Sequence, residues 1–430
     1  MKIGWLGNRE KHFNNYQYVK NALSNTHYLF FGELIKRGYE VHYIGLMGKS
    51  DGTRKDKAGK LEQENQFVIE NFNKLDLDKR FTISIEDKVK VNTSWMNVKV
   101  NETFSDFTQS YLDSDIFPDD LDILWIDNFM NHGSLANSCY LNALLKKFPK
   151  ALVFVYDEVA EWVEGMFDPR IDFGKDRERI IVLGTFSREA RYWSFPARGV
   201  ESFFYCFDKD NVLDVCRNPK VDLQYFGRMV IGRNTHYNLV FNESKKFNFQ
   251  VHTDLNLSKY SKECIIDDQT ILQQNNQTHF LKKYPDIHWE LNYTLPCNMY
   301  RIYNEAYCTF VPVVNHRANY GLISLRPWEA VISGTLPFYT QHFYEWQEFT
   351  SEDFILDEGE NAGEIIEYIK GLSFAQRKSI VKANRERFEK FDYRNMVNQF
   401  EKLIDLYSNR KYSHDVPFIK KENVLLTDLK

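Results

Sequence analysis

Short apolar segments that alternate with helix-like segments are the feature that most constrains this fold. Residues 2–6 and 40–46 have the β-branched and aromatic content of strands, and they flank a helical pattern over 28–37 that ends at Gly38. Three further apolar runs are LDILWID (121–127), ALVFVYD (151–157) and IIVLGT (180–185). Such continuous apolar runs are typical of strands buried on both faces, so we predict an α/β fold with parallel sheets.

A second series of strand-like segments begins near Val221. Its members are residues 221–226, 287–291, 307–313 and 335–340, and the pattern is helical almost to the end beyond Asn361. A chain of 430 residues is too long for one core. We therefore predict two Rossmann-like domains, 1–212 and 213–395, that face a central cleft, and a helical segment, 396–430, that packs back toward the first domain.

The charge balance limits which partners the chain can attract. It has 55 Lys+Arg against 60 Asp+Glu, a net charge of −5, so a nucleic acid would have to meet a local basic surface. No apolar stretch approaches the roughly 18 residues of a membrane span, and no secretory signal is recognisable. The six cysteines form no CxxC pair. We therefore expect reduced thiols in a cytoplasmic protein that has no membrane partner.

The segment SLRPWEAVISGTLPF (324–338) has the sharpest chemical signal. Arg326 and Glu329 are three residues apart, so they share a face on the first turn of a helix. A guanidinium suits phosphate oxygens, a carboxylate suits ribose hydroxyls, and the amides of a helix N-terminus attract anions. Gly334 then allows a sharp turn into a strand. The alternative is an ordinary ion pair on a helix surface.

Basic residues follow the strand at 221–226. Gly227 and Arg228 come directly after it, and Arg233 follows shortly. Arginines between a strand and a helix can neutralise a diphosphate, although a basic turn is more often simply solvated. The chain has no GxGxxG, HExxH or DxD motif in a suitable context, which argues against dinucleotide-binding, zinc-protease and GT-A readings.

Asp157 ends the apolar run ALVFVY. A carboxylate at a strand end beside aromatic side chains can act as a general base, because partial desolvation raises its pKa. Glu158 and Glu161 could compete for this role, and a helix N-cap is an equally common use of such an aspartate. Asn25 precedes the helical pattern, where it could likewise serve as a cap.

Two segments resemble the phage DNA β-glucosyltransferase family. They are PCNMYRIYNEAYCTFVPV (296–313) and NYGLISLRPWEAVISGTLPF (319–338), in the family's order and at nearly its spacing. Weaker similarity covers residues 24–46, 148–162 and 221–233, so the resemblance extends over about a quarter of the chain. It implies a GT-B fold, with a DNA-binding acceptor domain followed by a UDP-sugar-binding domain.

The resemblance implies an inverting transfer of a sugar from a UDP-sugar to 5-hydroxymethylcytosine in duplex DNA. Asp157 resembles the family's catalytic base, and Arg326 the arginine that binds the diphosphate. Glu329 resembles the glutamate that binds the uridine ribose. Gly227, Arg228 and Arg233 match the segment near the phosphates. A divalent ion, Mg²⁺ or Mn²⁺, could assist the departure of the UDP leaving group.

Two departures from the family pattern concern the donor. The spacing from Arg228 to Arg233 is one residue longer, and Asn25 stands where the family has a glutamate that reaches the donor sugar. An amide donates as well as accepts hydrogen bonds, whereas a carboxylate only accepts them. Glucose and a pentose such as arabinose therefore both remain open as the sugar.

A duplex DNA partner would require the target base to be flipped out of the stack. Candidate basic contacts are Arg54, Lys55, Lys57, Arg188, Arg191 and Arg198. Charge runs are usually solvated faces, which is the alternative for all six. We expect a monomer, located in the cytoplasm of the infected host cell if the chain is phage-encoded.

Two other functions compete with this hypothesis. EAVISGTLPF (329–338) also resembles the Glu-Ala-x-x-x-Gly-Thr-x-Pro segment of many retaining GT-B enzymes, so a GT-B enzyme with a saccharide or lipid-linked acceptor is an alternative. A non-catalytic protein that binds a nucleotide or DNA is the second.

Overall fold

The structure is a computed structural model of the chain. It describes residues 1–8, 26–46, 81–85, 118–127, 134–157, 172–185, 197–204, 206–227, 229, 231–253, 268–291, 296–312, 324–340, 343, 348–356 and 362–408. Contacts within the chain group these residues into two compact units. The described residues within 1–8, 30–204 and 396–408 belong to unit 1, and those within 26–29 and 206–395 belong to unit 2.

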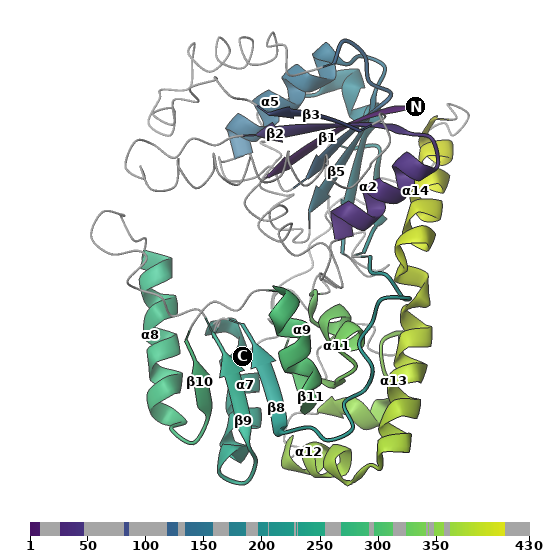
Figure 1. The fold of residues 1–430 in the computed structure, drawn as a ribbon. Helices are drawn as coiled ribbons and strands as arrows, with labels where there is room; N and C mark the ends of the chain where they lie inside the picture. The colour runs from purple at the N-terminus through teal and green to yellow at the C-terminus, as the bar shows by residue number, and fades with distance from the viewer. Residues whose placement is uncertain are drawn as a thin grey trace. The chain divides into compact units, whose positions relative to one another are not determined.

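The described strands of unit 1 form one parallel sheet (Figure 1). They are β1 (Lys2–Asn8), β2 (Glu40–Leu46), β3 (Phe81–Ile85), β4 (Ile123–Asp127), β5 (Leu152–Asp157), β6 (Ile180–Gly184) and β7 (Gly199–Ser202). Their order is β3-β2-β1-β4-β5-β6-β7, so the winding direction reverses between β1 and β4. Ligands of such sheets bind beyond the carboxyl ends of the strands, close to this reversal.

The described strands of unit 2 repeat this order as β10-β9-β8-β11-β12-β13. They are β8 (Val221–Phe226), β9 (Phe249–His252), β10 (His288–Glu290), β11 (Ala306–Val311), β12 (Leu336–Thr340) and β13 (Ile355–Leu356). All their pairings are parallel, and the reversal falls between β8 and β11. The predicted α/β class with parallel sheets is therefore confirmed in both units.

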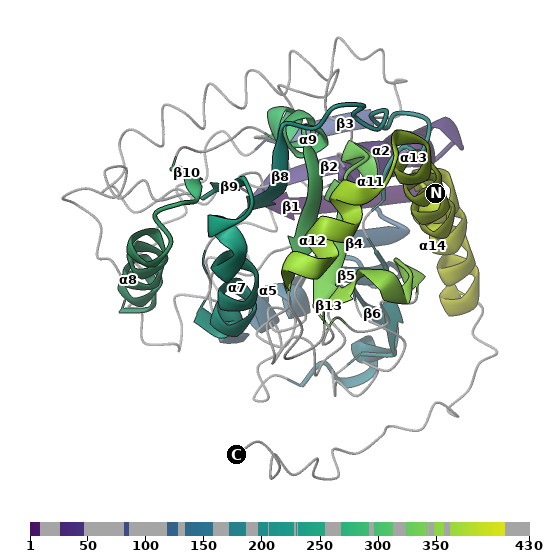
Figure 2. The same ribbon diagram turned by 90° about the horizontal axis from the view of Figure 1, so that it is seen from below.

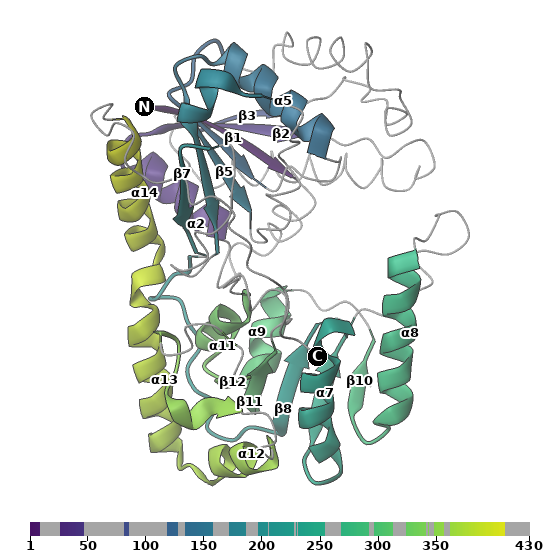
Figure 3. The same ribbon diagram turned by 180° about the vertical axis from the view of Figure 1, so that it is seen from behind.

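Helices cover both faces of the second sheet. They are α7 (Asn234–Phe241), α8 (Asp268–Lys283), α9 (Pro296–Asn304), α11 (Arg326–Ser333), α12 (Ala362–Gly371) and α13 (Phe374–Phe388). Figures 1 and 3, which look from opposite sides, show α9 and α11 on one face and α7 on the other. Figure 2 shows α8 beside β10, at the edge of the sheet.

Alternating side chains of β8 serve these two faces. Leu223 and Tyr225 enter the core cluster that also contains Tyr237 of α7, whereas the ring of Phe226 packs against Tyr303 of α9 at 4.6 Å. This alternation is the ordinary period of a strand. As a result, aromatic side chains lie on both faces of the sheet at the carboxyl end of β8.

Parts of two helices pack on one face of the first sheet within unit 1. They are α2 (Thr26–Lys36) from Phe30 onward and α14 (Tyr393–Ser408) from Met396 onward, whereas α5 (Ser134–Lys147) lies on the other face (Figures 1 and 3). Phe30 of α2 and Phe400 of α14 both contact Trp125 of β4, with ring centroids 5.3 and 5.4 Å apart from it. The helical C-terminal pattern predicted from Asn361 onward is thus confirmed as α12, α13 and α14.

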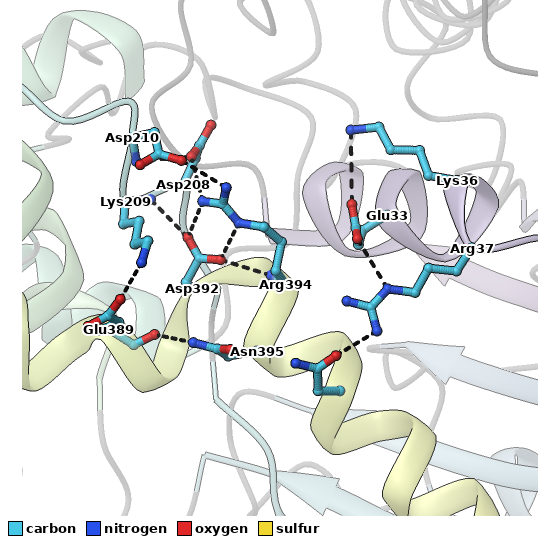
Figure 4. Close-up of polar contacts among 11 residues, drawn as sticks. Glu33, Lys36, Arg37, Asp208, Lys209, Asp210, Glu389, Asp392, Arg394 and Asn395 are labelled. Carbon is cyan, nitrogen blue, oxygen red and sulfur yellow. Dashed lines mark hydrogen bonds and ion pairs between the residues drawn. The ribbon is translucent and has the colours of Figure 1, made fainter.

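A salt-bridge cluster lies near the start of α14, inside unit 2 (Figure 4). Asp392 accepts hydrogen bonds from Nε and Nη2 of Arg394, both at 2.7 Å, and from the backbone amide of Lys209 at 3.2 Å. Arg394 also donates to Asp210 at 2.8 Å and to Asp208 at 3.5 Å. Residues 207 and 392 form a parallel β-bridge, so this cluster joins two segments that are distant in sequence.

Candidate functional site

The candidate donor site lies where the second sheet reverses its winding. Gly227 directly follows β8, and α11, which begins at Arg326, follows β11, the neighbouring strand. Gly227 has a φ of 143°, a conformation that side chains with a Cβ rarely adopt. A Cβ at this position would also collide with Nη2 of Arg326. Glycine therefore lets the backbone after β8 approach the guanidinium.

Arg326 and Glu329 form the ion pair that the sequence predicts. Nη1 of Arg326 donates to Oε2 of Glu329 at 3.0 Å, in the first turn of α11. The two side chains are 18% and 10% exposed, so the pair is largely removed from solvent. Interactions between charges are stronger in such a place than on an open surface. The alternative of an ordinary surface pair does not fit this burial.

A buried tyrosine completes the pair. Tyr303 of α9 is fully buried, and its hydroxyl accepts a hydrogen bond from Nη1 of Arg326 at 3.0 Å and donates to Oε2 of Glu329 at 3.3 Å. The Thr335 hydroxyl donates to the backbone carbonyl of Tyr303, and Asn304 donates to the carbonyl of Ser333 at 2.6 Å. The end of α9 is thus bonded to the end of α11.

Two further tyrosines lie close to Arg326 and Arg233. The guanidinium of Arg326 lies over the ring of Tyr225, 4.9 Å from its centroid. The Tyr225 hydroxyl is 3.1 Å from that of Tyr237. Burial raises the pKa of Tyr237, and the positive charge of the nearby Arg233 partly opposes that rise. Two arginines separated by 93 positions in the sequence therefore both lie near one pair of buried tyrosines.

The ionisation of the buried groups follows from these contacts. Burial alone would lower the pKa of Arg326, but Tyr303 and the carboxylate of Glu329 outweigh it and raise that pKa above its usual range. Burial raises the pKa of the Tyr303 and Tyr237 hydroxyls well above 10. Arg326 is therefore charged and these tyrosines are neutral at any physiological pH.

The amides at the start of α11 contribute less than the sequence predicts. Pro327 has no amide hydrogen, and the amides of Trp328 and Glu329 both donate to the carbonyl of Leu325, at 3.1 and 3.2 Å. An anion at this helix end would therefore meet chiefly the guanidinium of Arg326. Gly334 ends the helix in the left-handed conformation, with a φ of 72°, and so makes the predicted turn.

The loop after β8 is anchored from α8. Nδ2 of Asn276 donates to the carbonyl of Met229 at 2.6 Å, and the Asn276 side chain also exchanges hydrogen bonds with Asn234. These bonds fix both sides of the segment that carries Arg233. The sequence does not predict the roles of Asn276, Tyr225, Tyr237 and Tyr303, since nothing local distinguishes them from ordinary core and helix residues.

Asp157 lies at the carboxyl end of β5, as the sequence predicts. It is paired in register with Gly184 of β6, and its neighbour Tyr156 with Asp127 of β4. The backbone thus brings it to the edge of the first sheet where ligands of such folds bind. The conformation of its side chain lies outside the described atoms.

Arg198 has a structural contact in unit 1. Its Nη1 donates to the carbonyl of Tyr407 at 2.6 Å, in the last turn of α14, and its guanidinium lies over the ring of Tyr407. A cation there complements the helix dipole. The other residues predicted to bind DNA or donor lie outside the described residues: Asn25, Arg54, Lys55, Lys57, Arg188, Arg191 and Arg228.

No group of three or more His, Cys, Asp or Glu side chains in the described ranges could hold a metal ion. Within the same ranges, every helix falls short of the length or the apolar character that crossing a bilayer requires.

Comparisons with known proteins identify the fold. No protein-family model matches the chain, and no curated protein matches its sequence. Among solved structures, a sucrose-phosphate synthase from Thermosynechococcus elongatus superposes with a TM-score of 0.58 at 11% identity, over 95% of this chain and 99% of that one.

Two glucosyltransferases are also similar in structure. An α-glucosyltransferase in complex with UDP and a 13-mer DNA has a TM-score of 0.50 at 13% identity, and covers 95% of this chain and 100% of its own. A DNA-modifying β-glucosyltransferase gives the same values. Identities this low establish the fold alone. The chain has the GT-B fold, as the resemblance implied, with a helical C-terminal segment.

Proposed function

We propose that this protein is a UDP-sugar-dependent glycosyltransferase that acts on 5-hydroxymethylcytosine in duplex DNA. The observation that carries the donor part is the buried guanidinium of Arg326 against Gly227 at the winding reversal of the second sheet. The acceptor part is supported by the two sequence blocks that resemble DNA glucosyltransferases. It is also consistent with a structural neighbour that is bound to UDP and DNA.

In the proposed reaction, unit 2 binds the donor. Arg326 and Arg233, together with Arg228, neutralise the diphosphate, and Glu329 accepts hydrogen bonds from the ribose hydroxyls. Such fixed positive charge stabilises the negative charge that develops on the leaving group. Gly227 gives the diphosphate close access to the backbone, and Asn25 contacts the sugar.

Unit 1 supplies the acceptor chemistry in this proposal. The Asp157 carboxylate takes the proton of the hydroxymethyl group as its oxygen attacks the anomeric carbon. The bond from that carbon to the phosphate oxygen breaks, and its electron pair leaves with UDP. Attack on the face opposite to the leaving group inverts the anomeric configuration.

Nucleoside mass spectrometry tests the proposal. Hydroxymethylated and unmodified duplexes are incubated with a panel of UDP-hexoses and UDP-pentoses, with and without a metal chelator. We expect a mass increase of one sugar residue, confined to the hydroxymethylated duplex. An unchanged nucleoside across the panel, with transfer to saccharides instead, would favour the alternative acceptor. UDP binding without transfer to any acceptor would favour the non-catalytic alternative.

Asp157→Asn tests the general base. We expect it to abolish transfer and to leave UDP affinity within about twofold, because the base does not contact the nucleotide. The matched control is Asp122→Asn. Asp122 accepts from the amide of Lys2 at 2.7 Å, at the opposite end of β4 from the strand ends that carry the site. Full turnover by Asp157→Asn would contradict the assignment.

A further inference from the structure

We propose that Tyr303 is a positioning residue for the donor diphosphate, which it orients through Arg326 and Glu329. This inference rests on the proposed function and deepens it. Tyr303 lies in the segment 296–313 but is not among the candidate site residues that the sequence predicts, and it lies on α9, whereas both of its partners lie on α11.

The hydroxyl of Tyr303 is committed to its two partners. It accepts from Nη1 of Arg326 at 3.0 Å and donates its single proton toward Oε2 of Glu329 at 3.3 Å. The ring is fully buried. The hydroxyl therefore has no proton left to donate to a ligand, and its effect on UDP must pass through Arg326 and Glu329.

These bonds determine which atoms remain for a ligand. Both hydrogen bonds that Arg326 makes to described residues use Nη1, and both that Glu329 makes use Oε2. Within the described part of the chain, Nε and Nη2 of Arg326 and Oε1 of Glu329 have no such bond. Nη2 lies against Gly227, beyond the end of β8. The tyrosine thus holds the guanidinium with two donor atoms directed away from the protein pair.

The Tyr225–Tyr237 pair supports Arg326 from a second side. The ring of Tyr225 lies against the face of the Arg326 guanidinium, and the Tyr225 hydroxyl contacts that of Tyr237 at 3.1 Å. Stacking on a rigid, buried ring reduces the conformational freedom that Arg326 would lose when it binds a diphosphate. The Arg326 guanidinium is therefore positioned before a ligand arrives.

Tyr339 provides a matched control in the same unit. It is fully buried on β12, burial raises its pKa as it does for Tyr303, and its hydroxyl has no hydrogen-bond partner among the described residues. A change of Tyr339 to phenylalanine removes the same atom from a similarly buried ring. If Tyr303→Phe weakens UDP binding and Tyr339→Phe does not, the difference must come from the hydrogen bonds of Tyr303 to Arg326 and Glu329.

The test is calorimetric titration with UDP of Tyr303→Phe, Tyr339→Phe, Arg326→Gln and the double variant Tyr303→Phe/Arg326→Gln. We expect Tyr303→Phe to weaken UDP binding about tenfold, the usual size for a hydrogen bond to a charged group, and Tyr339→Phe to change it less than twofold. In the Arg326→Gln background, Tyr303→Phe should weaken UDP binding less than a further twofold, since the guanidinium that Tyr303 orients is absent.

The outcomes separate this inference from the proposed function. If the wild type binds UDP and Tyr303→Phe binds it equally well, or if its effect persists undiminished in the Arg326→Gln background, the positioning role is overturned. If the wild type does not bind UDP, the proposed function fails first. Should Tyr303→Phe not fold, Tyr237→Phe removes the hydroxyl that contacts Tyr225, the ring on which Arg326 lies. We expect this variant to bind UDP about threefold more weakly, and unchanged UDP binding would overturn the positioning of Arg326 by buried tyrosines.

Discussion

Unit 2 contains two arginine–carboxylate clusters that each have a largely buried carboxylate, and they differ in how many of the arginine's donor atoms are hydrogen-bonded within the protein. In one, Asp392 is 2% exposed and accepts from two side-chain nitrogens of Arg394, while the same guanidinium also reaches Asp208 and Asp210 (Figure 4). In the other, Arg326 donates through a single nitrogen to Tyr303 and Glu329, within the described residues.

The difference separates a structural cluster from a binding cluster. A buried charge is costly unless its hydrogen bonds are satisfied, so the saturated cluster around Asp392 has what a purely structural role requires. Arg326 is 18% exposed against 36% for Arg394, yet its Nε and Nη2 make no hydrogen bond within the described residues, at a place where folds of this type bind ligands. Substitutions in the two clusters should therefore have different effects.

Asp392→Ala should have the largest effect, and that effect should be on stability. It leaves Arg394 without its buried partner and should lower the free energy of unfolding by about 3 kcal/mol. Urea denaturation followed by tryptophan fluorescence measures this, and calorimetry should find UDP affinity unchanged. A variant as stable as the wild type would mean that the cluster is not structural.

Gly227→Ala should lower both the free energy of unfolding and the affinity for UDP, each by a smaller amount. The substitution strains the backbone at a φ of 143° and displaces Arg326, so we expect about 1 kcal/mol of destabilisation and roughly fivefold weaker UDP binding. Gly371→Ala is the control, because a Cβ there meets no atom within 4 Å. Equal UDP affinity in Gly227→Ala and the wild type would show that Arg326 need not lie against this turn.

The stabilisation from Asp392 should disappear in acid. Burial would raise the pKa of this carboxyl, but hydrogen bonds from the Arg394 side chain and from the amides of Lys209 and Arg394 lower it below its usual value. A lowered native pKa means that the stabilisation is present above about pH 4 and is lost as the pH falls further. The stability gap between the wild type and Asp392→Asn should therefore narrow between about pH 5 and pH 3. A constant gap would contradict this linkage.

Asp120→Asn should have the smallest effect. Asp120 pairs with Lys2 at 2.7 Å, but the two side chains are 74% and 43% exposed. Solvent screens such pairs, so we expect no measurable change in the urea midpoint. A loss comparable to that of Asp392→Ala would show that burial is not what distinguishes these clusters.

The sequence predicts the fold where its signal is local. The strand at 40–46 has the observed bounds, and the helix at Arg326 begins where Pro327 favours a first turn. β9 and β7 were missed because each has four residues, and those of β7 are all partly exposed, so neither has a clear apolar run. The formation of such short strands depends on pairing with neighbouring strands of the sheet, which the local sequence does not reveal.

The site was predictable only in part for the same reason. Arg326 and Glu329 are three positions apart on one helix, and spacing reveals such a pair. Tyr225, Tyr237 and Tyr303 come from β8, α7 and α9, and they meet only after the sheet has formed. In the sequence, a buried tyrosine whose hydroxyl holds an arginine looks the same as Tyr339, whose hydroxyl holds nothing in the described structure.

The most direct test of the contrast applies one substitution to both clusters. UDP is titrated calorimetrically into the wild type, Arg326→Gln and Arg394→Gln. We predict that Arg326→Gln weakens UDP binding about a hundredfold, as expected when a charged contact to a phosphate is removed, whereas Arg394→Gln stays within twofold of the wild type. Equal affinities in the two variants, or a larger loss in Arg394→Gln, would contradict the assignment of Arg326 to the donor.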